Sequence, residues 1–147
     1  MTLDFGTPTP TQSTHAPHKW SFELNYSSPP PGLSANDTGS KWKRINSTKH
    51  IRTEVYYKVK ALRIPTLQRI RVEVEWVVVV DRDRDASNLG LFTKPIYDGI
   101  GAKHEPSAHV VADDTAAFMD TPTPTIRLAR NERARFIVTI TEVEVTK

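Results

Sequence analysis

Hydrophobic and polar positions alternate along two segments of the chain and recur at helical spacing along two others. Alternation from Trp20 to Tyr26 and over 69–80 predicts two strands. The second of these strands begins with one charged face and ends with both faces apolar, which favours a central place in a sheet. The β-branched segment 135–145 predicts the last strand, and a weak strand is expected over 117–120.

Two helices follow from apolar residues that recur every three or four positions. The first has its apolar face at Ile51, Val55, Val59 and Leu62, and it is expected to begin near residues 46–48, after a loop over 34–44. The second is expected over 86–100, with an inward face made of Leu89, Phe92, Ile96 and Ile100. The resulting order, β-α-β-α-β-β, predicts an α+β fold with helices packed on a mixed sheet.

Length and composition limit the class of protein. The 147 residues suggest one domain over 20–147, preceded by a flexible Thr/Pro-rich arm at 1–19. No apolar run approaches the roughly 20 residues of a membrane-spanning helix. The absence of cysteine excludes disulfide scaffolds, thiolate catalysis and cysteine-ligated metals, and it favours a cytoplasmic location.

The net charge of +3 hides an uneven distribution. Residues 41–71 contain ten Lys and Arg against one acid, whereas residues 72–120 contain ten acids against four bases. The basic block predicts a surface for a polyanion, with a solvated helix face as the alternative. The candidate DNA-binding residues are Lys41, Trp42, Lys43, Arg44, Lys49, Arg52, Arg82 and Arg84. Trp42 is interpreted either as a stacking partner for an unpaired base or as a buried anchor.

Acidic residues cluster where the second strand ends. Asp81, Asp83 and Asp85 alternate along the chain, so their carboxylates are expected to point to one side. A second pair, Asp113 and Asp114, follows the second helix and could fold back to the first group. Clustered carboxylates are the oxygen ligands that Mg²⁺ prefers. The alternative is a solvated turn in which the intervening arginines offset the acidic charge.

Several short motifs resemble the RusA-like Holliday junction resolvases, especially those of phages that infect actinobacteria. They are Asp-Arg-Asp-Arg-Asp-Ala-Ser-Asn-Leu at 81–89, Lys94, Asp98-Gly99, Asp113-Asp114-Thr115, and the segments 22–26 and 138–142. The resemblance implies a RusA-like fold and a homodimeric endonuclease that requires Mg²⁺, with Mn²⁺ as an alternative. Such enzymes resolve four-way DNA junctions by paired nicks during recombination and repair.

The resemblance also implies roles for individual residues. The implied catalytic residues are Asp85, Lys94 and one or both of Asp113 and Asp114; the implied metal ligands are Asp83, Asp85, Asp113 and Asp114; Asn88 and Ser87 are supporting residues. Ser87 departs from the family pattern, because the second aspartate of the motif is expected there. Asp83 is a possible substitute for that missing ligand. A catalytically weak or inactive relative that only binds junctions is therefore the alternative function.

Overall fold

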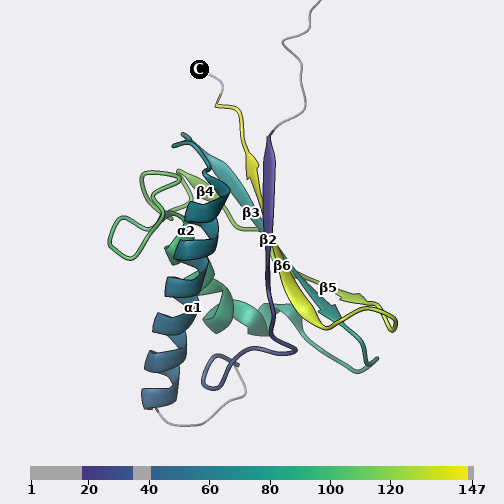
Figure 1. Cartoon of the computed structure of the whole chain (residues 1–147). Helices are drawn as coiled ribbons and strands as arrows, with labels where there is room; N and C mark the ends of the chain where they lie inside the picture. The colour runs from purple at the N-terminus through teal and green to yellow at the C-terminus, as the bar shows by residue number, and fades with distance from the viewer. Residues whose placement is uncertain (1–17, 35–40, 146–147) are drawn as a thin grey trace, which may run out of the picture.

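The described part of the chain is a five-stranded mixed sheet with two helices packed on it (Figure 1). The structure, a computed structural model, describes residues 18–34 and 41–145. Its elements are β2 (Lys19–Leu24), α1 (Lys41–Leu62), β3 (Ile70–Val78), a 3₁₀ turn (Ala86–Leu89), α2 (Gly90–Gly101), β4 (Met119–Asp120), β5 (Thr125–Leu128) and β6 (Arg135–Glu142). The predicted α+β class is confirmed.

Strand β3 lies in the middle of the sheet, as its pattern predicted. On one side it pairs antiparallel with β6, which in turn pairs antiparallel with the edge strand β2. On the other side it pairs parallel with two short strands, β4 at its start and β5 at its end. Its alternate residues Ile70, Val72 and Val74 are buried against the helices.

The hydrophobic core lies between the helices and one face of the sheet. Ile51, Val55 and Val59 of α1 are buried as predicted, whereas Leu62 is half-buried. The predicted inward face of the second helical region is buried throughout: Leu89, Phe92, Ile96 and Ile100. Each such side chain, when fully buried, contributes roughly 1.5–3 kcal/mol. Because the spacing of apolar residues reports burial directly, these two faces could be read from sequence.

The start of the first helix was predicted too late. Helix α1 begins at Lys41, so the basic residues assigned to the loop over 34–44 occupy its first turns. Hydrophobic spacing could not show these turns, because Trp42 and Ile45 are exposed and no residue of α1 before Ile51 is buried. At the other end, Arg63 adopts a left-handed φ of 56° and ends the helix before Pro65.

Other boundaries differ in smaller ways. The region 86–100 is a 3₁₀ turn followed by α2 rather than one helix, and the last strand ends at Glu142. The weak strand is the two-residue β4. Strand β5 was not predicted, because four residues after Pro122 and Pro124 are too short to show a period. Residues 1–17 of the predicted arm lie outside the described residues, and Lys19 belongs to β2.

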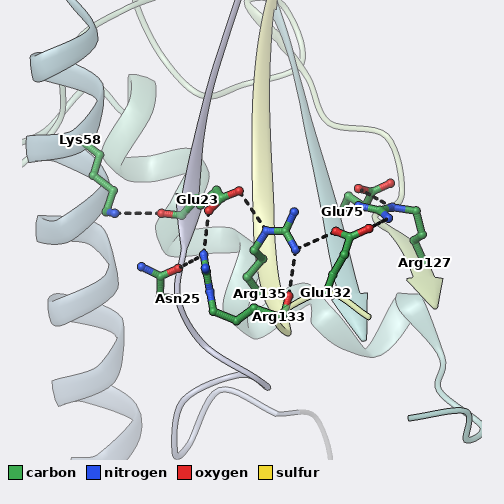
Figure 2. A network of polar contacts seen from close by, with 8 residues as sticks. All are labelled: Glu23, Asn25, Lys58, Glu75, Arg127, Glu132, Arg133 and Arg135. Atoms are coloured by element: carbon green, nitrogen blue, oxygen red, sulfur yellow. Dashed lines mark hydrogen bonds and ion pairs between the residues drawn. The ribbon is translucent and has the colours of Figure 1, made fainter. Parts of the chain in front are cut away.

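A network of ion pairs crosses the sheet face opposite the helices and joins four strands (Figure 2). Glu23 of β2 contacts Arg135 of β6 at 2.9 Å, and Glu75 of β3 contacts Arg127 of β5 at 3.2 Å. Glu132 joins the two pairs by binding both arginines. These arginines are paired with the carboxylates of this network, whereas helix α1 has no acidic residue in its first turn.

Candidate functional site

Lys94 lies between two carboxylates that come from different parts of the chain. Its Nζ is 2.8 Å from Asp98 Oδ1 and 2.9 Å from Asp114 Oδ2. Helix α2 brings Lys94 and Asp98 together because residues four apart share a helix face. Asp114 arrives through the fold, since the following loop runs back along α2. We call Lys94, Asp98 and Asp114 the lysine–carboxylate cluster.

Hydrogen bonds fix the loop that supplies Asp114. The backbone amides of Ala108 and Val110 donate to the carbonyls of Gly99 and Ile100 at the end of α2. Asp113 Oδ1 accepts from the backbone amides of Lys103 and Asp114, at 3.2 and 2.8 Å. The side chain of Asp113 therefore shapes the loop, and the Asp114 side chain is the one that reaches Lys94.

The two carboxylates of the cluster differ in proton affinity. Burial raises the pKa of Asp98, and a hydrogen bond with Asp114 raises it further. The same hydrogen bond, together with Lys94, holds the pKa of Asp114 well below its usual range. Burial alone would lower the pKa of Lys94, but its hydrogen bonds to the two carboxylates raise it. At neutral pH the cluster therefore presents a charged ammonium beside an ionised Asp114.

Asp98 was not assigned a role from sequence, although the Asp98-Gly99 pair was part of the resemblance. Its side chain is only 15% exposed and contacts Lys94, with Arg52 Nη1 at 4.0 Å. The signal that could have found it was its position four residues after Lys94 on a predicted helix.

Asp83 and Asp85 line a cavity of about 530 Å³ together with Trp76 and Asn88, and no residue of the lysine–carboxylate cluster lines it. Asp85 caps the 3₁₀ turn, where its Oδ1 accepts from Ser87 N at 3.0 Å and from Ser87 Oγ at 2.7 Å. The hydroxyl and then the amide of Ser87 lower the pKa of Asp85. Neither Asp113 nor Asp114 lines this cavity.

The predicted single group of Asp83, Asp85, Asp113 and Asp114 is therefore not assembled in this structure. Over residues 18–34 and 41–145, no three His, Cys, Asp or Glu side chains form a group that could hold a metal ion. Mg²⁺ needs fewer protein ligands than that, because it commonly binds one or two carboxylates together with waters and substrate phosphates. The adjacent carboxylates of Asp98 and Asp114 fit such a site in kind and number.

The predicted DNA-binding residues divide between two regions. Lys41, Lys43, Arg44 and Lys49 are exposed along the first half of α1. A groove of about 430 Å³ follows this half and is lined by Arg44, Ile45, Thr48, Lys49, Arg52 and Pro106. Arg82 and Arg84 lie elsewhere, in the segment after β3. Trp42 is 71% exposed, which contradicts the alternative of a buried anchor.

Arg52 connects the groove of α1 to the lysine–carboxylate cluster. Its Nε donates to the carbonyl of Pro106 at 2.8 Å, and its Nη2 donates to the carbonyl of His104. Its Nη1 faces Asp98 on the other side. Helices α1 and α2 come close enough for this because Gly99 has no Cβ, which would lie 2.7 Å from the carbonyl oxygen of Arg52.

Two further observations concern the class of protein. None of the described helices combines the length and apolar content that crossing a membrane requires. No protein-family model matches the chain, and no curated protein matches it either.

Proposed function

We propose that this chain is a RusA-like endonuclease that uses Mg²⁺ to nick opposing strands of four-way DNA junctions, acting as a homodimer. The observation that carries the proposal is the contact of Lys94 with Asp98 and Asp114 beside the groove of α1. Lys94 and Asp114 are residues for which the sequence resemblance implies catalysis. They are 20 positions apart in the chain, so local sequence does not account for their contact.

The charges around the groove support a path for the DNA backbone. Lys41, Lys43 and Lys49 have no ion pair within the described residues, so their charge is available to phosphates. Arg52 lines the same groove and lies against Asp98. A strand whose phosphates follow α1 would therefore pass beside the lysine–carboxylate cluster.

The residues of the cluster suit phosphodiester hydrolysis. The ammonium of Lys94 can bind a phosphate oxygen and offset negative charge that develops there. Asp114, ionised at neutral pH and with a pKa well below its usual range, can accept a hydrogen bond from an attacking water and orient it. Mg²⁺, when bound, would supply further positive charge at the phosphate. Asp98 holds Lys94 in place through its hydrogen bond of 2.8 Å.

A junction-binding protein without cleavage is the second candidate, and Ser87 favours it. Ser87 stands where a carboxylate is expected, and its hydroxyl donates a hydrogen bond to Asp85. If Asp85 is needed for catalysis, as the resemblance implies, this bond would weaken metal binding by Asp85.

The test is cleavage of a synthetic four-way junction at 10-fold excess protein, in Mg²⁺ and in EDTA, beside a linear duplex of the same sequence. We expect paired nicks in the junction in Mg²⁺ only, and an intact duplex. Tight binding of the junction without cutting in Mg²⁺ or Mn²⁺ would overturn the endonuclease and support the second candidate. No binding of either DNA would overturn both.

Removing three cations from α1 is expected to weaken binding in a salt-dependent way. In the variant K41Q/K43Q/K49Q, the slope of log affinity against log salt should become shallower by about 2 to 3, since each lost phosphate contact contributes about 0.9. The control variant K19Q/R71Q/R130Q removes three exposed cations outside α1. Fluorescence anisotropy across a salt series measures both slopes, and equal slopes would place the DNA away from α1.

A further inference from the structure

The cavity lined by Asp83 and Asp85 contains no residue of the lysine–carboxylate cluster, to which the proposed cleavage is assigned. It lies where the chain leaves β3 and enters the 3₁₀ turn before α2. Its lining consists of Pro29, Ser34, Trp76, Asp83, Arg84, Asp85, Asn88 and Leu89. Its volume of about 530 Å³ is in the range of small-molecule sites. We call it the Trp76–Asn88 cavity.

A layered platform forms one wall of this cavity. The ring of Trp76 stacks on Phe136, with centroids 5.3 Å apart and planes at 15°. Over the ring of Trp76 lies Arg84, whose Cζ is 5.2 Å from the centroid. Two hydrogen bonds hold the platform, from Trp76 Nε1 to the carbonyl of Ser27 at 3.1 Å and from Arg84 Nη1 to the carbonyl of Val80 at 2.8 Å. Rings and guanidinium groups of this kind are the surfaces on which unpaired bases stack.

The remaining polar groups of the cavity suit the edge of a base better than a phosphate. Asp83 and Asp85 place two carboxylates there against the single cation Arg84, so a phosphate would meet net negative charge. Asp85 takes both of its side-chain hydrogen bonds on Oδ1, which leaves Oδ2 open among the described residues. The Asn88 amide offers a donor and an acceptor. Carboxylates accept from exocyclic amino groups, and asparagine pairs with adenine.

We propose that the Trp76–Asn88 cavity binds one unpaired nucleobase of the bound DNA, stacked on the Arg84–Trp76 platform and hydrogen-bonded by Asn88. The inference rests on the proposed function, because it takes branched DNA as the ligand. Bases that carry an exocyclic amino group are preferred over thymine, since the rim is rich in acceptors. The cavity thereby selects branched DNA, whose crossover can present an unpaired base, over a continuous duplex.

The experiment uses a four-way junction with 2-aminopurine at one crossover position, bound by the full chain in EDTA so that no cleavage occurs. Stacking on the platform should quench 2-aminopurine fluorescence. We expect Arg84→Ala and Asn88→Ala to lose the quenching and to bind the junction about 10-fold more weakly, within the range measured for base stacking. For both variants the loss of affinity should be larger for the junction than for a linear duplex of the same sequence. Both side chains lie on the cavity rim away from the core cluster, so folding, checked by circular dichroism, should be retained.

Arg130→Ala and Asn131→Ala are the matched controls, because they remove the same types of side chain from exposed positions outside the cavity and outside the predicted DNA-binding residues. Junctions with thymine at the crossover should bind more weakly than those with adenine or cytosine.

If the wild type cuts junctions while Arg84→Ala and Asn88→Ala show wild-type quenching and affinity, the base site is overturned and the endonuclease stands. If the wild type quenches and binds but never cuts, the endonuclease is overturned and the base site stands. Absence of DNA binding overturns both.

Discussion

Asp114→Asn is expected to lower the rate of junction cleavage by about 100-fold, while the protein still binds the junction. Asparagine keeps the size of the side chain but removes the ionised oxygen that lies 2.9 Å from Lys94 Nζ. It also removes one of the two adjacent carboxylates that suit Mg²⁺. The rate is measured in single turnover with saturating protein, so that a change in affinity does not enter the result.

Asp81→Asn is the matched control for this variant. Asp81 is an exposed carboxylate 3.9 Å from Arg130, outside both the cluster and the Trp76–Asn88 cavity. Its loss should leave the cutting rate unchanged. Equal rates for Asp114→Asn and Asp81→Asn would show that the lysine–carboxylate cluster is not the catalytic site.

Asp85→Asn separates the assignment based on sequence from the one based on structure. The resemblance implies that Asp85 is catalytic, whereas the structure places it in the Trp76–Asn88 cavity with Ser87. A loss of single-turnover cutting as large as that of Asp114→Asn would support catalysis by Asp85. A loss of junction affinity with normal cutting at saturation would support a role in the cavity.

Much of the fold was predictable because the spacing of apolar residues indicates which side chains are buried. The faces at Ile51, Val55 and Val59 and at Phe92 and Ile96 are buried, since a residue that must avoid water recurs once per helical turn. The central position of β3 in the sheet was predictable because both faces of the strand are apolar at its end. The predictions were wrong or missing where an element buries few residues. The first turns of α1 carry exposed cations, so no apolar spacing marks them. Strand β5 is held in place by pairing with β3, and its own sequence is too short to show a pattern.

The candidate site was less predictable, because its geometry depends on contacts between distant residues. Lys94 and Asp114 could be named from the resemblance, but the choice between Asp113 and Asp114 depends on which carboxylate the loop uses for its own backbone. Arg52 was expected on the DNA-facing surface, yet its guanidinium is bound to carbonyls of the loop after α2 and lies near Asp98. The spacing of residues within α1 does not indicate that the Arg52 side chain contacts the loop after α2.

Phe136→Ala is expected to have the largest effect on stability, about 3–5 kcal/mol. Phe136 is fully buried near the start of β6 and stacked on Trp76, and its ring centroid lies 4.4 Å from that of Phe92. Alanine would leave a cavity between the sheet and α2, which the neighbouring rings can fill only in part. A loss of this size is a large share of the roughly 5–15 kcal/mol that keeps a typical domain folded.

Ile137→Ala is the control, since Ile137 is the next residue of β6, half-buried on the opposite face of the sheet. In urea unfolding, Ile137→Ala should lower the free energy of unfolding by less than half as much as Phe136→Ala does. The two variants also differ in a second property: Phe136→Ala removes the ring on which Trp76 stacks, so folded Phe136→Ala should lose the quenching of 2-aminopurine, whereas Ile137→Ala should keep it. Equal unfolding free energies for the two variants would contradict this prediction. They would mean that the fully buried Phe136 contributes no more to stability than the half-buried Ile137 on the opposite face of the sheet.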